Sequence, residues 1–243
     1  MAKKLTPPAV HNMVRSAFDS PEEVSRALVK SYLSHPPFSY RLLGEIIRSA
    51  LKGHKLSKAT LDSAVLAHQK NPDYQKIFLE ITPLIFEHFS SISPKFILDI
   101  EPRKYKINHI EIPFKPPFAF GVGDEIIIPW FIFWKKNPLT EKQLSLLATI
   151  ISDLMSQDPD YRDAKIQIYD FGVGEDGEAR TLEITGLATI KKLSPQQLED
   201  ALLNFLNGYE MAEASIKKMA VTKESSKGKL NADQIGLFDE PQS

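Results

Sequence analysis

The chain has 243 residues, and its 30 Lys and Arg residues nearly balance 31 Asp and Glu residues. Hydrophobic residues make up 42% and charged residues 25%, which is typical of a globular protein with a proper core, and the charge balance argues neither for nor against nucleic acid. Cysteine is absent, which excludes disulfides, cysteine-ligated zinc sites and thiol nucleophiles.

Neither a signal peptide nor a membrane helix is expected. The first residues, "MAKKLTPPAVHNMVRS", are charged at the start but have no apolar stretch after it. No apolar run reaches the roughly 20 residues that a membrane-spanning helix needs. We therefore expect a cytoplasmic protein without a membrane partner.

Helical signals fill the first part of the chain, residues 1–93. Ser20 and Ser57 are each followed by apolar residues at helical spacing, which is typical of an N-cap. Another helix is expected to start near Pro72 and to be kinked by Pro83. The sequence therefore predicts an N-terminal helical region.

Strand signals begin near Pro94, where β-branched residues start to alternate with polar ones. The "GVGDE" stretch at 121–125 predicts a hairpin turn. The "IIIPWFIFWKK" segment that follows is apolar on both faces, which predicts a strand near the centre of a sheet. Pro129 within this segment predicts a bulge, or an edge on one side of the strand.

Further helix and strand signals complete the body. A helix capped by Thr140, two strands and a helix capped by Ser194 follow in order. We predict an α+β fold in which residues 94–219 form a mixed sheet flanked by helices. Beyond Met219 the apolar pattern stops, so residues 220–243 are expected to form a flexible, disordered tail.

The tail nevertheless carries large apolar residues close to its end, in "QIGLFD". Gln234 is followed by the adjacent pair Leu237 and Phe238, a spacing that resembles the binding motif of proteins that ride on the bacterial sliding clamp. In such peptides the glutamine hydrogen-bonds in one subsite and the Leu–Phe pair fills an apolar pocket. The resemblance implies a partner, the sliding clamp, and a role in DNA replication or repair. The alternative is that the tail packs on the body as a structural clasp.

The order of helices and strands from about residue 72 to 219 resembles the core of the PD-(D/E)XK nuclease superfamily. Active members carry an acid on the second core strand and an acid–x–lysine on the third, which bind a divalent cation beside the scissile phosphate. Here Lys135 stands where the lysine would, but Phe133 occupies the place of the acid, and "FKPPFAF" lies where the first acid should be. We expect a degenerate core with no catalytic residues, no metal and no cofactor.

A stretch crowded with aromatic residues and interleaved with lysines is the most unusual feature of the body. Trp130 and Trp134 are the only tryptophans, and Lys115, Lys135 and Lys136 accompany them. Aromatic rings stack on bases and lysines pair with phosphates, so these residues are candidate nucleic-acid contacts. A hydrophobic core would use the same aromatic residues. Basic residues of the N-terminal region offer further positive charge for DNA: Arg15, Arg26, Lys30, Arg41, Arg48, Lys52 and Lys55.

Two other function classes remain open. The first is a protein–protein interaction module with no nucleic-acid role. The second is an enzyme of unrecognised type that uses Asp158, Asp160 or Asp170 with a metal. The acidic stretch around Asp158, Asp160 and Asp163 is interpreted as a solvated connection between a helix and a strand. The leading hypothesis is a non-enzymatic protein of DNA replication or repair, with direct DNA binding open.

Overall fold

The computed structural model of the chain describes residues 5–34, 40–53, 57–174 and 177–235, the last fifteen of these by their backbone only. Its helices are α1 (Val10–Arg15), α2 (Pro21–Leu33), α3 (Arg41–Leu51), α4 (Lys58–His68), α5 (Pro72–Phe89), α6 (Glu141–Ser156) and α7 (Pro195–Ile235), with a 3-10 turn at Leu187–Thr189. Its strands are β1 (Phe96–Leu98), β2 (Arg103–Ile107), β3 (Ile110–Phe114), β4 (Ala119–Val122), β5 (Glu125–Ile132), β6 (Lys165–Asp170) and β7 (Glu183–Gly186). The predicted α+β class is confirmed.

The expected N-caps are present because each supplies an oxygen to a backbone N–H of the first helical turn. The hydroxyl oxygens of Ser20, Ser57 and Ser194 accept hydrogen bonds at the starts of α2, α4 and α7. Thr140 forms a capping box with Gln143 at the start of α6. Short α1 has no side-chain cap, and no sequence signal predicted it.

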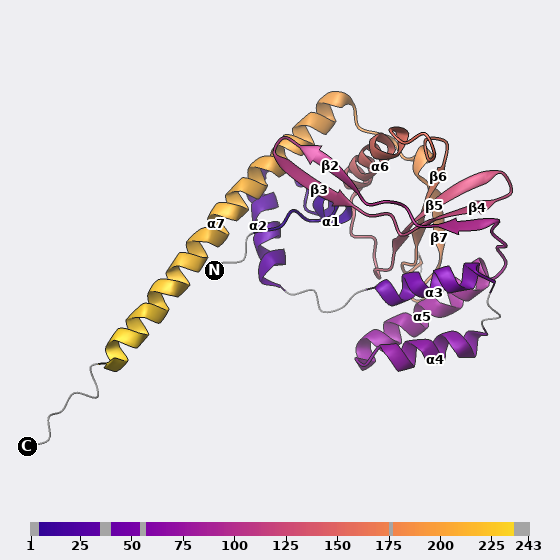
Figure 1. The fold of residues 1–243 in the computed structure, drawn as a ribbon, viewed down its shortest axis with the longest axis horizontal. Coiled ribbons are helices and arrows are strands. Elements are labelled where there is room, and N and C mark those ends of the chain that lie inside the picture. The colour runs from indigo at the N-terminus through magenta and orange to yellow at the C-terminus, as the bar shows by residue number, and fades with distance from the viewer. Residues whose placement is uncertain (1–4, 35–39, 54–56, 175–176, 236–243) are drawn as a thin grey trace, which may run out of the picture.

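The main sheet has five strands in the order β1-β4-β5-β6-β7, so β5 is the central strand, as its apolar faces predicted (Figure 1). β5 and β6 are parallel and are connected through α6, while the other neighbours are antiparallel. The predicted turn joins β4 to β5, with Gly123 at a φ of 58°. β2 and β3 form a separate two-stranded sheet. The sheet is therefore mixed, as expected.

Pro129 lies in β5 where the strand has a neighbour on one side only. The pairing of β4 with β5 ends at Ile127, whereas β6 continues alongside β5, with Gln167 opposite Pro129. A proline nitrogen cannot donate to a ladder, so it is tolerated where one side needs no donor. The predicted one-sided edge is confirmed.

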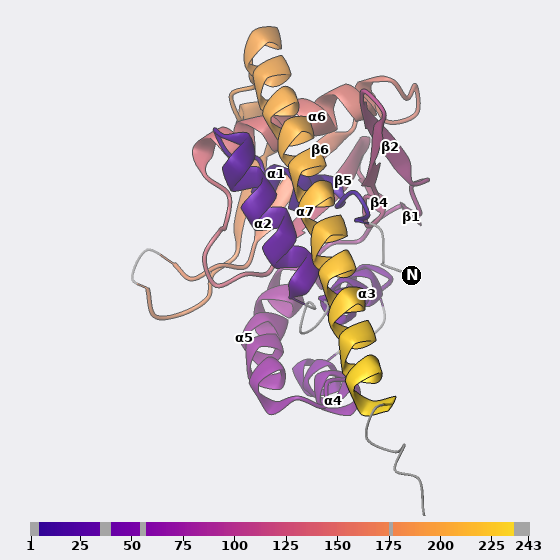
Figure 2. The same ribbon diagram turned by 90° about the vertical axis from the view of Figure 1, so that its left-hand side faces the viewer.

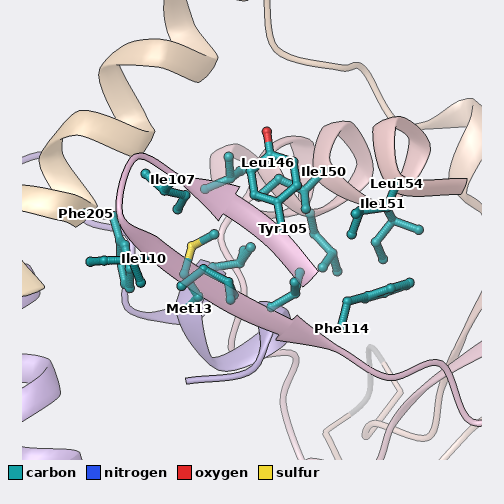
Figure 3. Close-up of a cluster of buried hydrophobic side chains, with 14 of the residues drawn as sticks. Met13, Tyr105, Ile107, Ile110, Phe114, Leu146, Ile150, Ile151, Leu154 and Phe205 are labelled. Carbon is teal, nitrogen blue, oxygen red and sulfur yellow. The ribbon is translucent and has the colours of Figure 1, made fainter. Parts of the chain in front are cut away.

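Two hydrophobic cores lie on opposite faces of the main sheet. One is formed by α1, α2, α6, α7 and the β2–β3 hairpin (Figure 3). The other is formed by α3, α4 and α5. Alternate residues of β5 point into each, with Ile128 and Ile132 in the first and Ile127 in the second. The N-terminal helices at 1–93 are therefore divided between two cores that share one sheet.

Helix α7 packs along α2, and the two lie side by side in both views (Figures 1 and 2). Its range continues past Met219 to Ile235, into the stretch that the apolar pattern predicts to be a flexible tail. The second half of α7 projects away from the body in Figure 1. No helix in the part of the chain that the structure describes is both long and apolar enough to cross a membrane.

Candidate nucleic-acid interface

A groove with a volume of about 750 Å³ opens where β5 ends, between α1 and α3. Its lining combines aromatic and basic side chains. The aromatic residues are Tyr40, Phe118, Trp130, Phe131, Phe133 and Trp134; the charged residues are Arg15, Arg41, Glu45, Arg48 and Lys115, with His11 at the rim. Elements distant in the sequence therefore meet at this groove.

The indole of Trp130 forms part of the groove wall and is fixed by two neighbouring rings. It stacks on the buried Phe114 ring, with centroids 5.7 Å apart and planes within 7° of parallel. The ring of His11 meets it edge-on at 6.0 Å. Trp130 is half-buried, so part of its surface faces the groove. Packing on both sides gives this aromatic wall a fixed orientation.

Arg15 lies over the other tryptophan. Its guanidinium carbon is 4.1 Å from the ring centroid of Trp134, which is cation–π geometry. The position of Arg15 is set by α6, because the amide of Gln143 donates hydrogen bonds to the carbonyl oxygens of Arg15 and Ala17, at 3.1 and 3.3 Å. The end of α1 thus holds an exposed cation against an aromatic ring.

Arg48 of α3 supplies a third type of contact. Its Nη1 donates to the Asp99 carboxylate at 2.6 Å, and its guanidinium carbon lies 5.9 Å from the centroid of the Phe118 ring. This hydrogen bond lowers the pKa of Asp99, with further lowering from the positive charges of Lys52 and Lys115. The same bond raises the pKa of Arg48. Arg48 is therefore a fixed, partly neutralised charge.

The groove has an excess of positive charge. Of its four Lys and Arg side chains, Arg41 pairs with Glu45 at 2.8 Å and Arg48 pairs with Asp99. Within the described ranges, no ion pair with an acidic side chain forms at Arg15 or Lys115. Both of these residues are exposed. The groove therefore has two charges available for an anion.

His11 adds a titratable group to the rim. Removal of water by the surrounding protein lowers the pKa of its imidazole, and the positive charge of Arg15 lowers it further. The ring still has an exposed edge. At neutral pH it is therefore an uncharged aromatic group beside Trp130.

Three of the predicted nucleic-acid contacts lie in this groove: Trp130, Trp134 and Lys115. Lys135 and Lys136 are exposed just beyond β5 and do not line it. The alternative, a hydrophobic core, applies to the phenylalanines around them, which are mostly buried, and in part to Trp130, which packs against the first core. The structure places arginines of α1 and α3 in the same groove, although they are distant in the sequence from the aromatic stretch.

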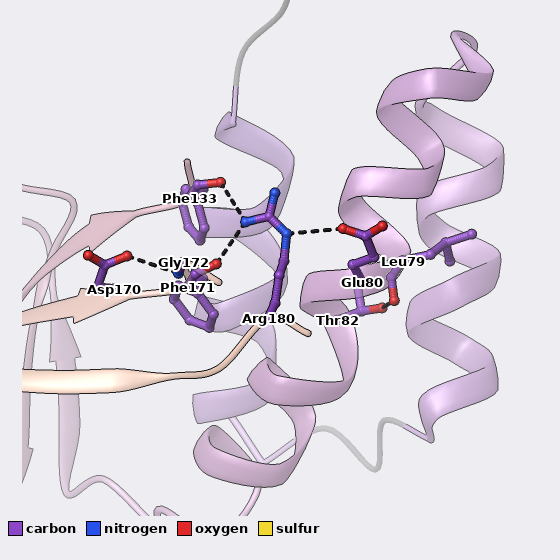
Figure 4. Close-up of polar contacts among 8 residues, drawn as sticks. All are labelled: Leu79, Glu80, Thr82, Phe133, Asp170, Phe171, Gly172 and Arg180. Atoms are coloured by element: carbon purple, nitrogen blue, oxygen red, sulfur yellow. Dashed lines mark hydrogen bonds and ion pairs between the residues drawn. The ribbon is translucent and has the colours of Figure 1, made fainter. Parts of the chain in front are cut away.

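A separate polar cluster ties the ends of β5 and β6 to α5 (Figure 4). Arg180 is 5% exposed, and its Nη1 donates to the carbonyl oxygens of Phe133 and Phe171 at 3.2 and 2.7 Å. Its Nε donates to Glu80 at 3.1 Å. These three hydrogen bonds join the strand ends to α5, so the cluster stabilises the strand ends beside the groove.

Two of the acidic residues weighed as cation ligands, Asp158 and Asp170, have protein partners. Asp158 pairs with Arg103, and it accepts a hydrogen bond from the backbone N–H of Asp160 at 2.9 Å. Asp170 accepts from the backbone of Gly172, while burial raises the pKa of its carboxyl. In the residues the structure describes, no group of three or more His, Asp or Glu side chains has the arrangement of a metal site.

The residues of the clamp-like motif fall at the limit of the described chain. Gln234 belongs to the last turn of α7, and only its backbone is described. Leu237 and Phe238 lie outside the described residues. The partner-binding role of these three residues stays a prediction.

The chain matches no described protein family. It is 30% identical over 154 residues to germacrene B synthase TPS16CC from Cannabis sativa, a match that covers 62% of this chain and 25% of that protein. The chain thus spans about a quarter of the length of this curated relative. A partial similarity of this extent does not assign the chain to a family.

Proposed function

We propose that this protein is a non-enzymatic factor of bacterial DNA replication or repair, recruited to the sliding clamp through Gln234, Leu237 and Phe238. The observation that carries the proposal is the "QIGLFD" sequence at the end of the chain. A leucine and a phenylalanine in an apolar pocket, with an amide to set the register, are sufficient for a micromolar interaction.

The position of α7 supports this proposal. The helix carries Gln234 in its last turn, and its second half extends away from the cores in Figure 1. Gln234, the first residue of the motif, therefore belongs to the part of α7 that lies beyond its contacts with α2.

The groove at the end of β5 supports a role at DNA. Its two available cations, Arg15 and Lys115, give it positive potential although the whole chain has a formal net charge of −1. Local charge of this kind determines where an anionic polymer binds. The tail would bring the protein to the clamp, and the groove of the body would contact the DNA that the clamp encircles.

Binding of the purified full-length chain to a purified bacterial sliding clamp tests the proposal, by surface plasmon resonance or calorimetry. We expect micromolar affinity for the original chain and at least tenfold weaker binding for a Leu237→Ala/Phe238→Ala variant. A Leu203→Ala variant, which changes an exposed leucine of α7, is the matched control and should bind as the original does.

Two outcomes would contradict the proposal. The first is no binding to the clamp by the original chain at high micromolar concentration. The second is equal binding by the double variant. If the double variant also unfolds at a temperature several degrees lower, the tail packs on the body as a clasp, and the interaction-module hypothesis replaces the proposed function.

A further inference from the structure

We infer that the groove between α1, α3 and the end of β5 is a binding site for single-stranded DNA. In this site a base stacks at the Arg15–Trp134 pair and a phosphate meets Lys115. The choice of DNA as the nucleic acid rests on the proposed function, while the single-stranded form rests on the groove itself.

Charge complementarity identifies the ligand as an anion. Arg15 and Lys115 are exposed and make no ion pair with a described acidic side chain, and Arg48 keeps further charge in the wall although Asp99 pairs with it. Glu45 is the acidic side chain in the lining, and Arg41 pairs with it. A site with this excess of cations favours a ligand with several negative charges close together.

The aromatic residues indicate that the anion carries flat rings. Trp130 and Trp134 both line the groove and are half-buried; Trp130 also packs against the first core. Trp134 has the exposed guanidinium of Arg15 over its ring. Aromatic rings and arginine planes together are the surfaces on which unpaired bases stack.

The arrangement favours a single strand over a duplex. The group available for stacking at this site is the guanidinium of the exposed Arg15, whose carbon lies 4.1 Å from the ring centroid of Trp134. A base in a duplex is already stacked on its neighbours, so only an unpaired base can stack on this plane. Single-strand sites span roughly 4–16 nucleotides, so a strand in the groove would continue past it. Lys135 and Lys136 are exposed beyond β5, where such a strand can pass.

Tryptophan fluorescence offers a direct test, because both tryptophans of the chain line the groove. The full-length protein is titrated with a thymidine oligonucleotide of about 12 residues, a length within the usual range of such sites. We expect saturable quenching with a micromolar dissociation constant. Heparin, a polyanion without bases, should bind at least tenfold more weakly and leave the emission nearly unchanged.

Variants locate the site. Arg15→Ala should weaken binding about tenfold, since it removes both a stacking plane and a charge. Lys115→Ala should reduce the slope of log affinity against log salt by about 0.7, the value for one lost phosphate contact on a single strand. Lys191→Ala, at an exposed lysine outside the groove, should change neither quantity. Arg15 and Lys115 are exposed, so both variants are expected to fold.

Three results would overturn the inference: equal affinity for heparin, equal affinity for a duplex of the same length, or unchanged binding in both variants. A clear preference for the matching uridine RNA strand would assign the groove to RNA instead. The Leu237→Ala/Phe238→Ala variant separates this inference from the proposed function. If that variant binds the oligonucleotide normally, the groove acts independently of the tail. If the original chain binds the clamp but not the oligonucleotide, this inference is wrong and the proposed function stands.

Discussion

At the scale of single residues, Arg180 joins three elements through one side chain. Its guanidinium is nearly buried and supplies donors to two strand-end carbonyls and to Glu80. Without it, the carbonyl oxygens of Phe133 and Phe171 would lose their donor in a place with little water. Phe133 also lines the groove, so Arg180 helps to fix the strand end that carries the aromatic wall.

Replacing Arg180 with methionine should lower the free energy of unfolding by about 3 kcal/mol, because buried carbonyls and the Glu80 carboxylate lose their partner. Urea denaturation measures this change. Lys95→Ala breaks the exposed pair with Asp124 and should cost less than about 1 kcal/mol. Equal losses in the two variants would contradict the structural role of Arg180.

The pH dependence of DNA binding should report on His11. The pKa of its imidazole is lowered from the ordinary 6.5, so the ring gains a proton only when the pH falls below that value. The added positive charge then favours the anionic strand, and affinity should rise about two- to threefold as the pH falls through this lowered pKa. His11→Gln should remove the rise. Affinity that falls on acidification in the original chain would contradict the expectation.

At the scale of secondary structure, close helix packing depends on one glycine. A Cβ atom at Gly208 of α7 would lie 2.5 Å from the Cβ of Val24 in α2 and 2.7 Å from the carbonyl oxygen of Pro21. Only a residue without a side chain allows the two helices to approach this closely. Gly44 of α3 is different, because a Cβ there would have no atom within 4 Å.

These two glycines give a matched pair of alanine substitutions. Gly208→Ala should destabilise the protein by about 2 kcal/mol, since α2 and α7 must move apart. Gly44→Ala should stabilise it by about 0.7 kcal/mol, because alanine is the better helix former and meets no clash. Thermal or urea unfolding of both variants provides the measurement. A stable Gly208→Ala protein would show that α7 does not pack on α2 as the structure has it.

At the scale of the whole molecule, the two cores share one sheet. Ile128 of β5 lies in the core formed with α1, α2, α6 and α7. Its neighbour Ile127 lies in the core formed with α3, α4 and α5. Each core packs on one face of the main sheet, so loss of the sheet would expose both cores to water. The groove lies where both halves meet, with α1 on one side and α3 on the other. Its integrity therefore depends on the complete body.

Unfolding should accordingly be a single cooperative transition. Tryptophan fluorescence, which reports on the groove, and far-ultraviolet circular dichroism, which reports on the helices of both cores, should give the same midpoint in urea. Two separate midpoints would show that α3, α4 and α5 unfold independently.

Deletion of residues 1–34 should abolish cooperative folding rather than leave a stable remainder, because α1 and α2 belong to the first core.

The sequence by itself determined the features that depend on local chemistry. The serine and threonine caps act on N–H groups within the same turn of helix, and the apolar faces of β5 follow from alternation along one strand. The hairpin turn at Gly123 likewise needs only its own backbone. These interactions involve neighbours in the chain, so a pattern of a few residues was sufficient to predict them.

Only the tertiary structure decided which distant residues meet. Helix α1 is six residues long with no side-chain cap, so it depends on packing against α6 rather than on its own sequence. The division of the N-terminal helices between two faces depends on which apolar stripe fits each face of the sheet. Arg15 meets Trp134 because α1 packs on one face of the sheet, and Arg48 meets Phe118 because α3 packs on the other. Residues this far apart are joined by the fold, and a single sequence contains no local signal for such contacts.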